Sequence, residues 1–267
     1  MKKSLFIIVV ILLLIVFGVS AFMVGSYLLE GKAQEERNDE LSAIVENAKN
    51  ETTEAPETTE ATQETTAPAT TEATEPQILP GYDELYEMNN DLVGWMRIEG
   101  TNVDYPVLQT PDDPNYYLYR DFDGNDSKRG SLYVWSEADV NEPSDNLTIF
   151  GHNMADGSMF ATLSNYIHDY YWEENSLIFF DTLYEYHTYK IFAVFKTSAN
   201  IGEGFSYHKF YEAANEEEFN DFVSTCKELS FYDTGITPVY GDKLITLSTC
   251  EYTLNNGRLV VCAVRIT

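Results

Sequence analysis

Basic residues are scarce in this sequence. Only 16 lysines and arginines stand against 44 aspartates and glutamates among 267 residues, for a formal net charge of −28. A surface that binds nucleic acid needs an excess of lysine and arginine to neutralise phosphates, so the composition excludes a nucleic-acid-binding protein. The same deficit excludes a protein that lies flat on an anionic membrane surface. Much of the acidic charge is expected to be solvated surface.

Cysteine is also rare, with three residues that stand far apart in the chain: Cys226, Cys250 and Cys262. An odd, widely spaced set of this kind predicts no disulfide framework and contains no CxxC metal pattern. No tight carboxylate loop with calcium-binding spacing accompanies Cys250, so neither a metal ion nor another cofactor is expected. A protein with so few cysteines is expected to keep one of them for chemistry, or none.

Charged residues are absent from residues 4–29, which follow a short basic start at residues 1–3. As a helix rising about 1.5 Å per residue, this run is long enough to cross a hydrocarbon core of about 30 Å. The lysines favour the cytoplasmic side, so the rest of the chain is expected to face outward from the cell membrane. A cleaved signal peptide is the alternative, because residues 19–21 resemble a cleavage site. The apolar run continues past that site, which favours an uncleaved, single-pass anchor.

Two polar segments follow the apolar run. Residues 30–50 carry a thin helical stripe of apolar side chains and are expected to form a juxtamembrane helix or stalk. Residues 51–77 consist almost wholly of Thr, Glu, Ala and Pro, with no lysine, arginine or large apolar residue before the domain begins. Such a segment cannot offset its ordering entropy by burial, so a disordered spacer is expected that holds the domain away from the bilayer. Residues 78–267 are expected to form one globular domain.

Short apolar segments separated by turn signals dominate residues 78–267. This pattern predicts a mainly β domain built as a closed or nearly closed barrel. A short helix is expected at residues 82–90. A longer amphipathic helix is expected at residues 212–231, where Asn215 and Glu218 form a capping box. The expected strands are residues 92–98, 103–108, 130–135, 146–150, 176–181, 186–195, 237–249 and 258–266.

The three cysteines occupy different positions in this pattern. Cys226 lies on the apolar stripe of the long helix, and Cys262 lies inside a fully apolar strand, so both are interpreted as core residues. Cys250 instead stands where an apolar strand meets a polar connection, and Arg258 opens the next apolar run. A thiol and a guanidinium are therefore expected to share one rim of a sheet. Cys250 is the candidate nucleophile.

A cysteine nucleophile reacts as the thiolate and needs a base or a nearby cation, most often histidine. The sequence has four histidines. His187 and His208 sit between tyrosines, which indicates a strand or loop surface, and His168 has no distinctive context. His152 directly follows an expected strand, the same arrangement as at Cys250. It is the candidate base.

Several motifs together resemble the class B sortases, membrane-anchored cysteine transpeptidases of Gram-positive bacteria. They are LVGWMRIEGTNVDYPVLQ, RGSLYVW, GHNMADGSMF and STCE with an arginine shortly after it. The resemblance covers residues 82–266. It implies an eight-stranded β barrel with N-terminal helices and one long helix before the last strands. It also implies that the catalytic trio is His152, Cys250 and Arg258.

The resemblance further implies a two-step acyl transfer. Cys250 would attack the carbonyl of a threonine in a C-terminal sorting motif, and His152 would protonate the leaving amine. The thioester acyl-enzyme would then pass the surface protein to an amine of a cell-wall precursor peptide. Arg258 would donate hydrogen bonds to the developing oxyanion or to the substrate backbone, and the backbone N–H of Glu251 could supply another.

Four further residues are expected to contact the substrate on the strength of the same resemblance. They are Ser248 and Glu251 beside the nucleophile, and Leu118 and Thr197 from more distant segments. The sequence departs from the class at Phe150, where members often have a tyrosine before the Gly-His pair. The connection that follows the nucleophile is also short for the class.

Two other functions fit part of the same pattern. A cell-wall cysteine peptidase would use the same residues and only hydrolyse its substrate. A non-enzymatic binding protein on a Thr-rich stalk would leave Cys250 merely buried. For Arg258 itself, the alternative to a catalytic role is a structural salt bridge with Glu251 or Asp242.

Overall fold

The computed structural model describes residues 2–54, 77–200 and 202–267. Nearly all of the expected spacer, residues 55–76, lies outside the described residues. The chain divides into two compact units, Met1–Glu40 and Leu41–Thr267. The first is the beginning of helix α1 (Lys2–Glu54), and the second contains the end of α1 and the rest of the chain.

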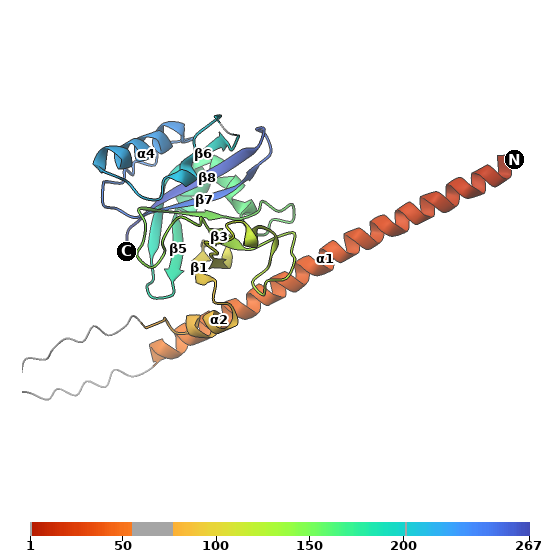
Figure 1. The fold of residues 1–267 in the computed structure, drawn as a ribbon, viewed down its shortest axis with the longest axis horizontal. Coiled ribbons are helices and arrows are strands. Elements are labelled where there is room, and N and C mark those ends of the chain that lie inside the picture. Colours follow the sequence, from red (N-terminus) through yellow and green to blue (C-terminus); the bar gives the residue numbers. More distant parts are fainter. Residues whose placement is uncertain (1, 55–76, 201) are drawn as a thin grey trace, which may run out of the picture. The chain divides into compact units, whose positions relative to one another are not determined.

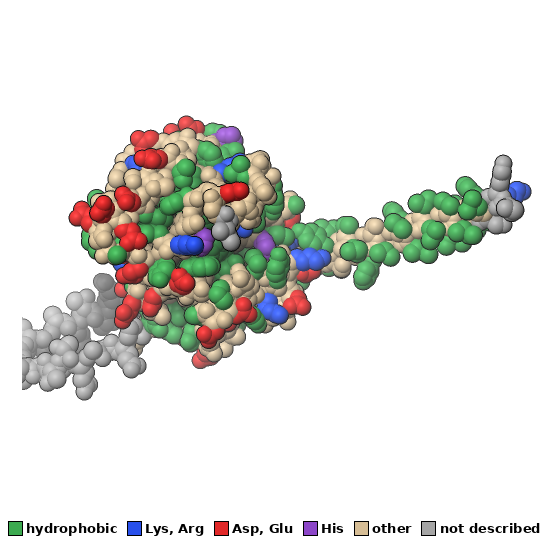
Figure 2. All heavy atoms as spheres, turned by 45° about the horizontal axis from the view of Figure 1, so that its top comes forward, with side chains coloured by type: hydrophobic (Ala, Val, Ile, Leu, Met, Phe, Trp, Pro, Cys, Tyr) green, Lys and Arg blue, Asp and Glu red, His purple; other side chains and the backbone are tan. Residues whose placement is uncertain are grey.

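The first unit is helical, and its apolar part, residues 5 to 24, has all of its side chains exposed. Hydrophobic side chains are present along the visible face of this part of the helix (Figure 2). A helix that is apolar all round needs an apolar medium to cover it. By length and composition the helix can cross a membrane, and a signal sequence near the N-terminus has the same character.

The second unit is built around a closed eight-stranded barrel, as expected (Figure 1). Around the barrel the strands follow the order β1-β2-β3-β4-β7-β8-β6-β5, and β5 pairs with β1 to close it. The strands are β1 (Leu92–Arg97), β2 (Asp104–Leu108), β3 (Leu132–Val134), β4 (Asn146–Phe150), β5 (Leu177–Thr182), β6 (Thr188–Ser198), β7 (Leu244–Glu251) and β8 (Gly257–Arg265).

All eight strands coincide with an expected segment, and the largest boundary difference is at β7. The strand begins at Leu244 and not at residue 237. Pro238 lacks an amide hydrogen for a ladder, and Gly241 adopts a left-handed conformation with φ +99°. The Asp242 carboxylate accepts a hydrogen bond from the Val239 amide at 2.8 Å and completes a turn there. The sequence pattern therefore predicted a strand from residue 237, but the backbone before Leu244 forms a turn and joins no β-ladder.

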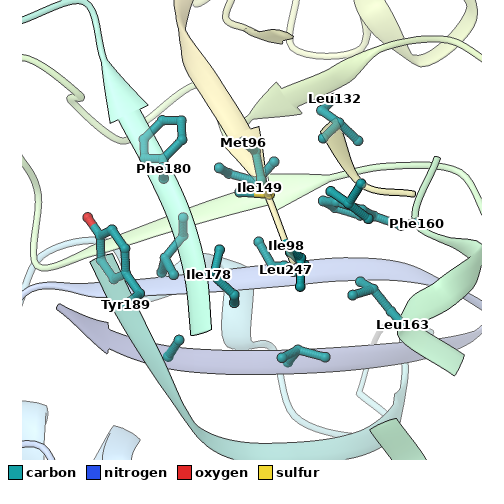
Figure 3. Close-up of a cluster of buried hydrophobic side chains, with 14 of the residues drawn as sticks. Met96, Ile98, Leu132, Ile149, Phe160, Leu163, Ile178, Phe180, Tyr189 and Leu247 are labelled. Atoms are coloured by element: carbon teal, nitrogen blue, oxygen red, sulfur yellow. The ribbon is translucent and has the colours of Figure 1, made fainter. Parts of the chain in front are cut away.

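Alternating apolar residues of the strands fill the inside of the barrel. Met96, Ile149, Ile178, Phe180 and Leu247 come from four different strands and share one buried cluster (Figure 3). Burying each such side chain stabilises the fold by about 1.5–3 kcal/mol. The barrel is therefore a packed core, and a functional site has to lie at its rim or on its outer surface.

Helical elements connect and cover the strands. Besides α1 they are α2 (Tyr82–Met88), η1 (Tyr116–Tyr119), η2 (Ala161–Ile167), α3 (Asp169–Glu174), η3 (Tyr207–Lys209) and α4 (Glu216–Leu229). α4 is the long helix expected before the last strands, and it lies outside β6 and β8 (Figure 1). Asn215 caps it, because its side-chain oxygen accepts a hydrogen bond from the Glu218 amide at 3.0 Å.

The end of α1 belongs to the barrel unit. Leu41 and Val45 are buried beside α2 and β1, and the ammonium group of Lys49 lies 2.7 Å from the carboxylate of Asp181. The compact unit thus begins at Leu41, whereas composition placed the start of the domain at residue 78. The two apolar side chains stand four residues apart on one helix face, which is enough to pack against the barrel.

Candidate active site

The parallel pairing of β4 with β7 brings the two reactive segments together. The register runs from Asn146 opposite Leu244 to Phe150 opposite Ser248, a constant offset of 98 residues. His152 and Cys250 have the same offset, since each lies two residues after the last pair, Phe150 and Ser248. Because parallel strands end at the same edge, and because alternate residues share a face, these two residues lie together at one rim.

Hydrogen bonds continue to join the two segments beyond the end of β4. The Gly151 amide donates to the Ser248 carbonyl at 3.1 Å, and the Thr249 hydroxyl donates to the Gly151 carbonyl at 2.8 Å. The Asn153 side-chain amide donates to the Cys250 carbonyl at 2.9 Å. The residues on both sides of the histidine are therefore fixed to the strand that carries the cysteine.

The imidazole of His152 is half-buried and has one polar partner. Its Nε2 atom lies 2.7 Å from the Leu118 carbonyl oxygen, and the Tyr119 ring lies alongside, with ring centroids 5.5 Å apart. A carbonyl oxygen only accepts, so Nε2 carries a proton in this arrangement. The Nδ1 atom is then the nitrogen left to take or give a proton.

Cys250 and Arg258 face each other across β7 and β8. They are direct cross-strand partners in the antiparallel ladder, and both are half-buried. The Nη1 group of Arg258 donates to the carbonyl oxygens of Asn256 and Gly257, at 3.3 and 2.9 Å. These bonds to its own turn hold one end of the guanidinium in place. They leave the Nε and Nη2 groups for other acceptors.

The salt bridge considered for Arg258 does not form. Glu251 pairs with Lys196 at 2.8 Å, and Asp242 completes the turn before β7. Among residues 2–54, 77–200 and 202–267, no carboxylate lies within ion-pair distance of Arg258. Its positive charge therefore faces the cleft without a neutralising partner from the described chain.

A cleft of about 230 Å³ lies over this rim. Of the seven predicted site residues it gathers five: the trio of His152, Cys250 and Arg258, together with Ser248 and Leu118. The other residues that line it are Asn115, Tyr133, Trp135, Phe150, Gly151, Ala199, Tyr207, His208 and Thr249.

Glu251 and Thr197, the other two predicted substrate contacts, do not line the cleft. The Glu251 carboxylate accepts hydrogen bonds from the Thr253 and Leu254 amides, each at 3.0 Å, and so orders the connection after β7. Burial alone would raise the pKa of Glu251, but hydrogen bonds from Lys196 and the connection lower it to about 2. Thr197 is buried, and its hydroxyl accepts from the Phe205 amide at 2.7 Å.

Aromatic residues form much of the cleft wall. The Tyr207 hydroxyl lies 2.5 Å from the Ser248 hydroxyl, so the predicted substrate contact Ser248 already has a protein partner. Burial raises the pKa of Tyr207 and of Tyr133 to about 12, so both phenols are neutral at physiological pH. Tyr133 also stacks on Phe150, with ring centroids 5.4 Å apart. Phe150, which departs from the class pattern, therefore contributes to an apolar wall of the cleft.

Two histidines lie elsewhere than expected. His208 was expected on a surface but is half-buried in the cleft, with its ring 5.2 Å from that of Trp135. Burial lowers its pKa, and nearby Lys209 and Arg258 lower it further, which favours the neutral ring. His187 was also expected on a surface but is buried, because the β5–β6 connection folds against the chain end and the Thr188 amide bonds to Thr267.

Sequence reasoning missed most of the aromatic wall. Tyr133 and Trp135 stand two residues apart in RGSLYVW, and strand alternation places such a pair on one face. That alternation was an available signal. Tyr207 and His208 come from the connection between β6 and α4, and no periodic pattern marks their return to the cleft. The described residues contain no group of three metal-ligating side chains that could hold an ion.

Comparison with known proteins gives one family. A family model described as a sortase domain matches residues 96–266. The chain is 28% identical over 188 residues to sortase B of Staphylococcus aureus, covering 70% of this chain and 75% of that protein. It is 33% identical over 181 residues to sortase B of Listeria monocytogenes, covering 67% of this chain and 71% of that protein.

Solved structures give the same answer. A Clostridium perfringens sortase B structure matches with a TM-score of 0.64 at 30% identity, over 70% of this chain and 100% of that one. A Staphylococcus aureus sortase B–substrate complex matches with a TM-score of 0.74, over 90% of this chain and 99% of that one. Because the identity of this second match is 24%, it supports the fold alone.

Proposed function

The chain belongs to the sortase family, whose members are transpeptidases, and on that premise we propose that it cleaves a C-terminal sorting motif after threonine and joins the surface protein to a cell-wall peptide amine. The observation that carries this proposal is the cleft that Cys250, His152 and Arg258 line together. A thiol, an imidazole and an unneutralised guanidinium are the groups that acyl transfer through a cysteine requires.

In the first step the Cys250 thiolate attacks the threonine carbonyl carbon and forms a carbon–sulfur bond. The carbonyl electrons move to oxygen, where a guanidinium N–H of Arg258 donates to the developing charge. The tetrahedral intermediate then collapses and the carbon–nitrogen bond breaks. His152 gives its proton to the leaving amine, and a thioester acyl-enzyme remains.

In the second step an amine of the cell-wall precursor peptide attacks the thioester carbon. His152, now neutral, takes the proton that the amine loses, and the carbon–sulfur bond breaks to release the thiolate. The product carries a new amide bond, and both catalytic side chains return to their starting protonation states. Water in place of the amine gives hydrolysis, so access to the acceptor side of the cleft decides the outcome.

The same proposal gives the apolar part of α1 the role of an uncleaved membrane anchor, with the barrel outside the cell. The basic start of the chain supports a cytoplasmic N-terminus, which leaves the domain after the apolar segment facing outward. Surface proteins that carry sorting signals and cell-wall precursors both meet the enzyme there. No cofactor takes part in either step.

The deciding experiment follows the covalent intermediate. The full chain in detergent micelles is incubated with a panel of candidate sorting peptides, and the intact protein mass is recorded. The expected result is an acyl adduct that disappears on addition of hydroxylamine or an amine acceptor. Cys250→Ala should give no adduct and no product. Cys226→Ala removes a buried thiol and is the matched control that should keep both.

Two further measurements separate this function from the alternatives. With an amine acceptor present, the product should be the ligated peptide and not the free carboxylic acid. If only the free acid forms at saturating acceptor, the enzyme is a hydrolase. Iodoacetamide should label half-buried Cys250 and inactivate the enzyme, while native Cys226 and Cys262 stay unmodified. A non-enzymatic binding protein would lose no function on labelling.

A further inference from the structure

Two cysteines that the proposed reaction does not use lie against each other. The sulfur atoms of Cys226, on α4, and Cys262, on β8, are 3.8 Å apart. Both side chains have no exposed surface and sit in the apolar cluster between the helix and the outer face of the barrel. The two cysteines are 36 residues apart in the chain, and the pair joins one helix to one strand.

The two sulfur atoms lie within contact distance of each other. A disulfide bond is about 2.05 Å long, so the two sulfur atoms, now 3.8 Å apart, need to approach each other by less than 2 Å to form one. Thr246 lies beside the pair, with its hydroxyl oxygen 3.7 Å from the Cys262 sulfur. Cys250 is not part of this cluster, because it lies four residues beyond Thr246, at the end of β7 that lines the cleft.

We propose that Cys226 and Cys262 form a disulfide bond that fastens α4 to β8 when the domain folds outside the cell, leaving Cys250 as the free thiol. An extracytoplasmic location favours such a bond, since thiols there are not kept reduced. The bond also keeps both core sulfurs from exchanging with the nucleophile. The inference concerns a modification site and does not need the transpeptidase reaction to occur.

The oxidant is a second disulfide, either that of a thiol–disulfide oxidoreductase or a small molecule such as oxidised glutathione. One cysteine thiolate attacks it, forms a mixed disulfide and releases one thiolate. The other cysteine thiolate attacks the protein sulfur of the mixed disulfide and releases the second. The two cysteines lose two electrons and two protons, and the oxidant becomes two thiols.

Closure has to precede the docking of α4. Burial raises the pKa of the Cys226 thiol, and the neighbouring Cys262 raises it further, so little thiolate forms in the native core. The docked helix also blocks the oxidant. Reduced native protein should therefore resist oxidation, while protein that folds in the presence of the oxidant should close the bond. Once formed, the bond is equally protected from reductants.

The test counts thiols after folding. The full chain is denatured with reductant, refolded in detergent with a glutathione redox buffer, denatured again and alkylated. The expected result is one alkylated cysteine per chain, Cys250, and a peptide pair containing Cys226 and Cys262 that separates on reduction. Three alkylated cysteines, a crosslink that includes Cys250, or crosslinks only between chains would overturn the proposal.

Stability gives a second, independent readout. Closing a loop of 36 residues lowers the entropy of the unfolded chain. Reduction should therefore lower the thermal unfolding midpoint of the oxidised protein by about 5–15 °C. Cys226→Ala and Cys262→Ala should show no response to reductant. An oxidised wild type whose midpoint does not respond either would refute the bond. Acyl-enzyme formation is measured separately, so a failed transpeptidase assay leaves this result interpretable.

Discussion

Replacing Arg258 with lysine keeps the positive charge in the cleft and removes the planar fork of donors. In the wild type, Nη1 is held by the Asn256 and Gly257 carbonyls, which fixes the direction of the remaining N–H groups. A lysine ammonium would bind those same carbonyls and carries no second, rigidly oriented donor. The variant therefore tests direction of donation separately from charge.

The expected magnitude follows from what the fork contributes. One preorganised donor to a developing oxyanion stabilises the transition state by about 2.7–4 kcal/mol, which corresponds to about 10²–10³ in kcat. The fold should tolerate the change, because Arg258 forms no ion pair with a described carboxylate and hydrogen-bonds to Asn256 and Gly257 of its own turn. We expect Arg258→Lys to lower kcat by that factor and to leave KM within about threefold.

The assay is steady-state transfer of a sorting peptide to a saturating amine, with acyl-enzyme formation followed in a rapid-mixing experiment. Arg265→Lys, at the other end of β8, is the matched control and should leave both constants unchanged. A rise in KM with kcat unchanged would show that Arg258 binds the substrate backbone in the ground state. That outcome would refute its assignment to the oxyanion.

Three further predictions follow from other contacts. Asn153→Ala loses the hydrogen bond to the Cys250 carbonyl and should lower kcat about 3–10-fold with little change in unfolding midpoint; an unchanged kcat would show that the bond does not position His152. Leu41→Ala should destabilise the barrel unit by about 2–5 kcal/mol in denaturant titrations, and exposed Asn47→Ala should not. Burial would raise the pKa of Glu251, but its hydrogen bonds hold it at about 2, below its unfolded value. Its stabilisation is therefore complete above about pH 5 and lost toward pH 2, and the unfolding free energies of wild type and Glu251→Gln should converge over that interval.

Local patterns were sufficient to predict that three chemically active side chains stand at strand ends. Cys250, His152 and Arg258 each mark a point where an apolar strand meets a polar connection, and that signal lies within a few neighbouring residues. Family resemblance then grouped them, and the cleft contains all three. The eight strands were predicted for the same reason, since each is a short apolar segment between turn residues.

Contacts between distant segments were not predictable in the same way. Glu251 was expected to touch the substrate because it follows Cys250, yet neighbouring strand residues point to opposite faces, and its side chain turns toward Lys196. Tyr207 and His208 reach the cleft only because their connection folds back over it. The stripe that contains Leu41 was visible in the sequence, but its docking depends on a matching surface that the barrel provides.

The parallel register of β4 and β7 has a consequence for when the enzyme becomes reactive. The proposed base and nucleophile, His152 and Cys250, are 98 residues apart and meet only when these two strands have paired, a contact that local folding cannot make. A slip of one residue would turn one of them to the opposite face. On the proposed function, the chain carries an unassisted thiol until its barrel closes, and acyl transfer begins only on a finished fold.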